Sequence, residues 1–138
     1  MDFAAARHAL QWAAGQAGGG GEVVAVHVLT PSMEFWRDLP PTGFTTWRGK
    51  LKGSLEGEWM DPLRTAGTKH EAVLVEDDSV DGALLRIGDE RGAVMIVLGK
   101  HGHGDLTDRL MGSVTYKVAH RSSRPVMIIP ADWTPEVP

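Results

Sequence analysis

The sequence predicts an α/β fold in which helices cover both faces of an open parallel sheet. Four short apolar runs rich in Val, Ile and Leu alternate with helical segments along the 138 residues. The runs at 22–29 and 93–98 show no alternation of polar and apolar residues, which is typical of strands buried on both faces. Strands that alternate with helices are joined by right-handed crossovers and form a parallel sheet.

The N-terminal half predicts two helices and one strand. Residues 3–17 are rich in alanine and place apolar side chains at helical spacing, which predicts a helix. A run of four glycines follows, and residues 22–29, EVVAVHVL, predict a buried strand. Residues 30–45 contain three prolines and no clear period, which predicts a loop. Residues 46–66 predict a helix with one apolar face, weakened by three internal glycines.

The C-terminal half continues the alternation. We expect strands at 70–77, 93–98 and 124–130 and helices at 81–92 and 113–121. Residues 1–130 are predicted to form a single α/β domain and residues 131–138 a tail.

Composition narrows the classes of function. The formal net charge is −4, and no basic face stands out, which disfavours nucleic-acid binding. The chain has no cysteine, which excludes disulfides and thiolate metal sites. No apolar run reaches the length of a membrane span and no signal-peptide pattern opens the chain, so we expect a cytoplasmic protein with no membrane partner.

A glycine-marked loop follows the strand at 93–98. Gly99 comes directly after the strand, where open α/β sheets bind ligands, and we expect it to approach a ligand closely or to adopt positive φ. Gly112 then precedes Ser113, the first residue of a predicted helix whose free N–H groups favour anions. The loop is neither a Walker loop nor a dinucleotide fingerprint. The alternative is that the glycines form turns and Ser113 only caps its helix.

The stretch GKHGHGDLTDRLMGSVTYKVAHRSSRPVMIIP, residues 99–130, resembles the universal stress protein family. It matches the family pattern Gly-x2-Gly-x9-Gly-[Ser/Thr] at Gly99, Gly102, Gly112 and Ser113. The segments ALQWA and VVAVHVL resemble, less tightly, the family's first helix and second strand. The resemblance implies an open parallel sheet of the universal stress protein/adenine nucleotide hydrolase-like type.

Members that carry this pattern bind ATP with a divalent cation, so the resemblance implies ATP with Mg²⁺ or Mn²⁺ as cofactor. It places Gly99 and Gly102 against ribose and phosphates, and Val28 and Leu98 at the adenine. The remaining expected phosphate contacts are His101, His103, Gly112, Ser113, Val114 and Thr115. We expect no side chain to ligate the metal directly, His101 and His103 included.

The sequence departs from the family at its start. The family opens with a central strand whose aspartate contacts adenine, whereas only Met-Asp-Phe precedes the first helix here. Asp2 is the possible counterpart of that aspartate. The first strand is therefore expected to be truncated or missing, because the natural chain starts further upstream or because this chain was shortened. The alternative is that another segment or a partner chain takes its position. A gap there leaves buried backbone groups unpaired.

A histidine and an acidic run are two further candidate sites. His27 lies in a buried strand and is expected to be a core histidine. The run Glu76-Asp77-Asp78-Ser79 is expected to be a solvated turn in which Ser79 caps the next helix, with a cation site as the alternative.

No nucleophile, catalytic carboxylate pair or base for a γ-phosphate stands out, so we expect no enzyme and at most slow ATP hydrolysis. The resemblance implies an ATP-binding regulatory protein of stress response with an unknown protein partner. One alternative is a nucleotide-free dimeric interaction module, and another is an ATP pyrophosphatase-like or nucleotidyl-transfer enzyme. The last strand is apolar and at the sheet edge. With the family resemblance, this predicts a homodimer through Arg124–Pro130.

Overall fold

The computed structural model describes residues 3–30, 41–100 and 113–135 as an alternation of helices and strands. In chain order the elements are α1 (Phe3–Ala17), β1 (Glu22–Leu29), α2 (Pro41–Glu56), the 3₁₀ helix η2 (Glu58–Met60), α3 (Asp61–Thr65), β2 (Lys69–Glu76), α4 (Val80–Arg91), β3 (Ile96–Gly99), α6 (Ser113–Arg121) and β4 (Val126–Ile129). The predicted α/β class and all four predicted strands are confirmed, and the bounds of α1, β1 and α6 match the prediction.

The predicted single helix at 46–66 is wrong. Helix α2 begins at Pro41, inside the segment expected to be a loop, and ends at Glu56. Gly57 then starts the separate turn η2, with φ −94° and ψ −110°, and α3 follows. A Cβ at Gly57 would lie 2.8 Å from the carbonyl oxygen of Gly53, so a larger residue would crowd the end of α2. Pro41 stands at the first helical position, where its missing N–H costs nothing.

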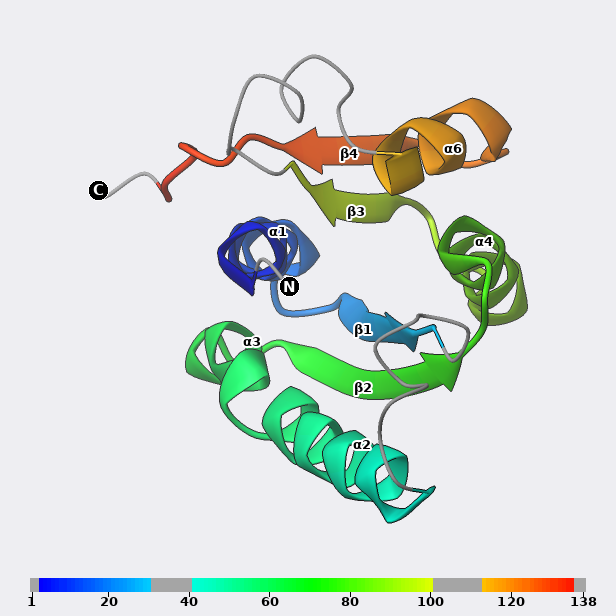
Figure 1. Ribbon diagram of the computed structural model, residues 1–138. Coiled ribbons are helices and arrows are strands. Elements are labelled where there is room, and N and C mark those ends of the chain that lie inside the picture. Colours follow the sequence, from blue (N-terminus) through cyan, green and yellow to red (C-terminus); the bar gives the residue numbers. More distant parts are fainter. Residues whose placement is uncertain (1–2, 31–40, 101–112, 136–138) are drawn as a thin grey trace.

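Parallel pairing is confirmed within two separate pairs of strands. Strand β1 pairs with β2 from Glu22↔Lys69 to Leu29↔Glu76, and β3 pairs with β4 from Ile96↔Val126 to Gly99↔Ile129. Within the described ranges, these are two two-stranded sheets rather than one continuous sheet. In Figure 1, β3 and β1 lie on opposite sides of a space that α1 and α4 flank. The truncated or missing first strand stays a prediction.

A buried hydrophobic cluster lies on the β1–β2 side. Ala14, Ala25, Leu55, Met60 and Leu63 form one buried cluster, in which Met60 and Leu63 are 1% and 0% exposed. The cluster joins α1, β1 and the helices α2 and α3. Burial of such side chains is the main source of stability. None of the described helices is both long and apolar enough to cross a membrane.

Candidate functional site

The candidate site predicted from the sequence is the glycine-marked loop, which β3 precedes and α6 follows in the chain. The backbone N–H of Ile96 donates to the carbonyl of Pro125 (2.9 Å), and that of Lys100 donates to the carbonyl of Ile129 (2.8 Å). Strand β3 is thus held along its length by β4, and the chain leaves it at Gly99 and Lys100. Five of the predicted contacts lie outside the described residues: Asp2, His101, Gly102, His103 and Gly112.

Gly99 packs against the backbone of α1, and its expected close approach to a ligand stays a prediction. Its φ is not positive, so that expectation is wrong; the described glycines with positive φ are Gly18, Gly67 and Gly92. A Cβ at Gly99 would lie 2.1 Å from the carbonyl oxygen of Ala5. Real Cβ atoms do not approach backbone so closely, so Gly99 permits the N-terminal part of α1 to pack on the end of β3.

The first turn of α6 presents the features of an anion site. Ser113 begins the helix and is exposed, Val114 is half-buried, and Thr115 is 5% exposed. The turn contains no acidic residue. The first N–H groups of a helix have no partner within the helix, and the dipole makes this end positive. An anion there would meet free donors and no carboxylate from the helix itself.

The other end of α6 is tied to the start of α4. A guanidinium nitrogen (Nη1) of Arg121 donates to Oδ2 of Asp81 at 2.5 Å, and the hydroxyl of Ser79 donates to Oδ1 of Asp81 at 3.2 Å. Burial raises the pKa of Asp81, but the hydrogen bond from Arg121 and the further hydrogen bonds to the carboxylate outweigh it, so the net pKa is lowered. The sequence analysis missed this pair, since nothing in the spacing signals a contact between residues 40 apart.

The two predicted adenine contacts lie on different sheets. Val28 pairs with Val75 near the end of β1, and Leu98 pairs with Ile128 near the end of β3. Both side chains are half-buried. The structure places each residue near the carboxyl end of its strand, where ligands of open α/β sheets bind. Their assignment to adenine stays a prediction.

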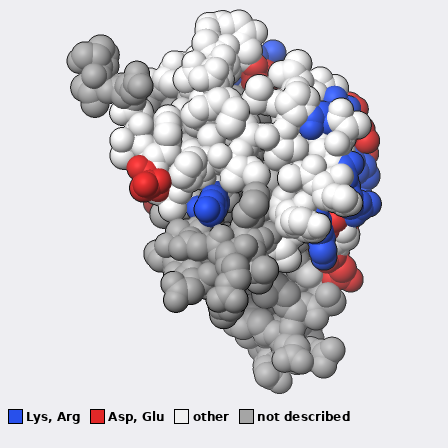
Figure 2. Space-filling view, turned by 90° about the horizontal axis from the view of Figure 1, so that it is seen from above, with Lys and Arg blue, Asp and Glu red and all other residues white. Residues whose placement is uncertain are grey.

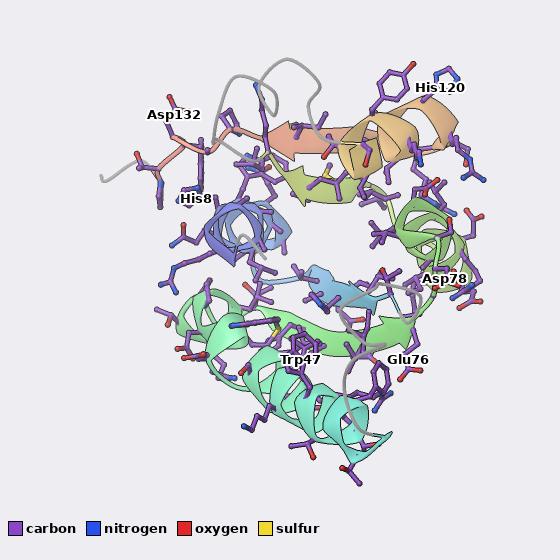
Figure 3. All side chains as sticks on the ribbon, viewed as in Figure 1. His8, Trp47, Glu76, Asp78, His120 and Asp132 are labelled. Carbon is purple, nitrogen blue, oxygen red and sulfur yellow. The ribbon has the colours of Figure 1, made fainter. Side chains whose placement is uncertain are left out.

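The acidic run after β2 forms a helix start. Ser79 caps α4 as predicted: its hydroxyl accepts from the N–H of Gly82 at 3.1 Å. Glu76 pairs with Arg48 of α2, and Asp77 pairs with Arg86 of α4 at 3.2 Å. The backbone N–H of Ser79 and the guanidinium of Arg86 lower the pKa of Asp77. Figure 3 shows Glu76 and Asp78 at the side where β2 leads into α4. In the described part of the chain, no cluster of acidic and histidine residues could hold a metal ion.

His27 is half-buried beside an aromatic ring. Its ring centroid lies 5.7 Å from that of Trp59 at an angle of 55°. Burial lowers the pKa of His27 below its ordinary value of 6.5. The histidine expected in the core therefore packs against Trp59 and borders a cavity, and it does not belong to the fully buried cluster.

We expect this histidine to make stability pH-dependent. Because its pKa is lower in the folded than in the unfolded chain, protonation favours unfolding. Its contribution is complete above pH 6.5 and is lost as pH falls through the lowered folded value. Denaturant titrations between neutral pH and about pH 5 should show falling stability, with a shallower slope in His27→Gln. Equal slopes in the two proteins would contradict this assignment; His70→Gln, on the neighbouring strand, is the control.

Comparisons with known proteins identify a family. The model of the universal stress protein family matches residues 2–130. A universal stress protein of Mycolicibacterium smegmatis is 31% identical over 116 residues, which is 80% of this chain and 36% of that protein. Universal stress protein MJ0577 of Methanocaldococcus jannaschii is 35% identical over 89 residues, 60% of this chain and 55% of that protein. The chain thus spans about a third and about half of these two relatives.

Solved structures agree on the fold. The structure of MJ0577 superposes with a TM-score of 0.73 at 24% identity and covers 91% of this chain and 87% of its own. A universal stress protein solved in complex with cAMP superposes with a TM-score of 0.70 at 23% identity, covering 96% of this chain and 91% of its own. At this level of identity the likeness concerns the fold.

Proposed function

The chain belongs to the universal stress protein family, and from that premise we propose that it binds an adenine nucleotide where β3 ends and α6 begins. The observation that carries the proposal is the first turn of α6, which has two hydroxyl side chains and no carboxylate, and whose first N–H groups have no partner within the helix. A solved universal stress protein of similar fold holds cAMP, which supports the adenine part of the proposal.

The residues at the start of α6 suit a nucleotide phosphate better than they suit a metal ion alone. Ser113 and the first N–H groups of α6 would take the phosphate oxygens, with Thr115 packed beneath them. Mg²⁺ or Mn²⁺ would accompany ATP through the phosphates and water rather than through a protein cage. We assign the adenine side to Val28 and Leu98, and the loop contacts to His101, Gly102, His103 and Gly112.

We assign the protein a regulatory role in stress response, in which nucleotide occupancy changes its contacts with a protein partner. Arg121 and Asp81 supply a physical route, because they fasten the far end of α6 to the start of α4. We propose no catalytic turnover beyond slow hydrolysis, because no residue of the sequence stands out as a base for a γ-phosphate.

Nucleotide release tests the proposal. We would heat-denature the purified protein and identify any released nucleotide by mass spectrometry, then measure thermal shifts with ATP, AMP and cAMP, each with and without Mg²⁺. We expect a retained adenine nucleotide or a saturable shift. An empty protein without any shift would favour the alternative of a nucleotide-free interaction module, whereas rapid turnover would favour an enzyme.

We also propose a homodimer through the last strand. Within the described residues β4 pairs with β3 alone, and Met127 on β4 is 39% exposed. Figure 2 looks down on the side of the molecule where β4 lies. Charged side chains gather mainly along the right side of this face, with a few at its left, centre and top. An open strand edge favours pairing with the same strand of a second copy.

Measuring the oligomeric state of variants tests the proposed interface at β4. Met127→Lys is expected to convert a dimer into a monomer in analytical ultracentrifugation, because two lysines would face each other across a two-fold axis. Val94→Lys serves as the control, since Val94 is 84% exposed and lies outside β4. A wild-type monomer, or a Met127→Lys dimer of unchanged affinity, would contradict the interface.

A further inference from the structure

Helix α6 carries an exposed aromatic pair. The rings of Tyr116 and His120 lie nearly parallel, with their centroids 5.9 Å apart and an angle of 4° between their planes. Tyr116 is 60% exposed, and His120 is exposed beside it. Figure 3 shows His120 on the outer side of α6, pointing away from the rest of the molecule. Stacking on a neighbour one turn away orients a large ring that remains open to solvent.

The aromatic pair belongs to one face of the helix. Residues at spacings of three, four and seven lie on the same side of an α-helix. Four exposed residues of α6 follow this spacing: Ser113, Tyr116, Lys117 and His120. On the opposite side, Thr115 and Val118 are 5% and 0% exposed. We call the four exposed residues the outer face of α6.

The outer face is basic and carries no carboxylate. Lys117 is exposed and forms no ion pair in the described part of the chain. Arg121 borders the face, and 56% of its side chain is exposed although it pairs with Asp81. Residues 113–125 include no acidic side chain, whereas the whole chain has a formal net charge of −4. A local basic surface on an acidic protein is complementary to a partner of negative charge.

The helix that bears this face is firmly held. The side chain of Val118 is fully buried beneath it. The guanidinium of Arg121 donates to Oδ2 of Asp81 at 2.5 Å, and the N–H of Ser122 donates to the carbonyl of Val118 at 2.9 Å. A surface that is already ordered loses little conformational entropy when a partner binds. The outer face of α6 is therefore a preformed surface.

We propose that the outer face of α6 docks an acidic peptide segment of a protein partner, with an aromatic side chain among its carboxylates. The aromatic side chain extends the stack of Tyr116 and His120. The carboxylates accept hydrogen bonds from the ammonium of Lys117 and the hydroxyl of Tyr116. Tyrosine is among the residues that dominate binding energy at protein interfaces.

The charges favour a peptide over a nucleic acid. Bases would also stack on the two rings, but a nucleic acid is held mainly by cations that follow its phosphates. Lys117 is the one lysine or arginine among the four residues of the outer face. A short acidic segment needs few cations, because its carboxylates can be placed where the face offers donors.

The choice of a protein as partner rests on the proposed regulatory role, and the outer face gives that partner a chemistry. Ser113 belongs both to this face and to the proposed phosphate site, so a bound phosphate would lie one turn from Tyr116. Docking itself requires no nucleotide. A protein that binds the peptide but no nucleotide would therefore contradict the proposed function and support the docking face.

A labelled synthetic peptide tests the proposal on the full chain without added nucleotide. The probe carries Asp and Glu residues around a central Phe. One control peptide has Asn and Gln in place of the acidic residues, and a second has Ala in place of Phe. We expect saturable binding of the probe in fluorescence anisotropy, about tenfold tighter than that of either control. Raising the salt concentration should weaken it, because the ion pairs lie at the surface. Absence of saturable binding would contradict the docking face.

Variants of the outer face locate the binding. Tyr116→Ala and Lys117→Glu should each weaken probe binding about tenfold, whereas Lys50→Glu, at an exposed position of α2, should leave it within about twofold. Tyr116→Ala should also keep its affinity for Mg-ATP, which separates this face from the nucleotide site.

Three results would overturn the proposal. Equal probe binding in wild type, Tyr116→Ala and Lys117→Glu would place the peptide elsewhere. Tighter binding of a single-stranded oligonucleotide than of the probe would indicate a nucleic-acid surface. Loss of self-association in Tyr116→Ala would indicate that a second copy of the chain covers the outer face.

Discussion

Replacing Gly99 by alanine is expected to lower the free energy of unfolding by about 1–3 kcal/mol, because one methyl group must displace backbone. The added Cβ would lie 2.1 Å from the carbonyl oxygen of Ala5, and 2.5 Å from its carbonyl carbon. Neither atom belongs to a flexible side chain, so α1 has to move away from β3. Denaturant unfolding of the nucleotide-free protein measures the effect.

Gly15→Ala is the matched control. Gly15 lies within α1, and a Cβ there would meet nothing within 4 Å. Alanine in a helix interior is favoured over glycine, so this substitution should raise stability by about 0.5–1 kcal/mol. If Gly99→Ala lowers the free energy of unfolding and Gly15→Ala raises it, the packing of α1 on β3 requires the glycine at position 99. If Gly99→Ala leaves stability unchanged but weakens nucleotide binding, the ligand explanation of Gly99 stands instead.

Replacing Ser113 by aspartate is expected to weaken nucleotide binding about a hundredfold while leaving the fold intact or slightly more stable. A carboxylate in the first turn of α6 would repel a phosphate at close range, and a cost of about 2–4 kcal/mol is typical of such partly solvated pairs. The same carboxylate favours the helix dipole by about 0.3–1 kcal/mol. Binding and stability should thus change in opposite directions, which separates a lost site from a damaged fold.

Ser123→Asp controls for charge. Ser123 is exposed and lies just beyond the end of α6, so the same substitution there should leave nucleotide affinity within about twofold. Titration calorimetry with Mg-ATP and with AMP provides the affinities. Equal affinities in Ser113→Asp and wild type would place the phosphate away from α6 and remove the basis of the proposed function.

Local sequence signals located most elements because the forces that set them are local. Alanine content and helical spacing predicted α1, and the β-branched run predicted β1, both with the observed bounds. The cap at Ser79 followed from its position before a helical pattern. The start of helix α2 is less evident from the sequence, because prolines are typical of loops and yet are favourable at the first helical position.

Some features of the candidate site could be predicted from the sequence and others could not. The glycine pattern and the helix start at Ser113 are written in consecutive residues, so the phosphate side could be proposed from the sequence. The contact of Gly99 with Ala5 and the pair of Arg121 with Asp81 join residues far apart in the chain. Neither spacing nor composition signals such contacts, because they arise only when separate elements pack together.

By itself the sequence determined the class of this protein: an α/β chain of the universal stress type, with largely apolar strands and a glycine-marked turn into a helix start. Only the tertiary structure decided that the strands of the described residues form two separate pairs, and that Gly99 meets the backbone of Ala5. The physical reason is that strand pairing satisfies backbone groups, which every residue carries alike. Side-chain patterns can therefore predict that a segment is a strand. They do not predict which strands pair with it, because that pairing depends on how the helices pack against the strands.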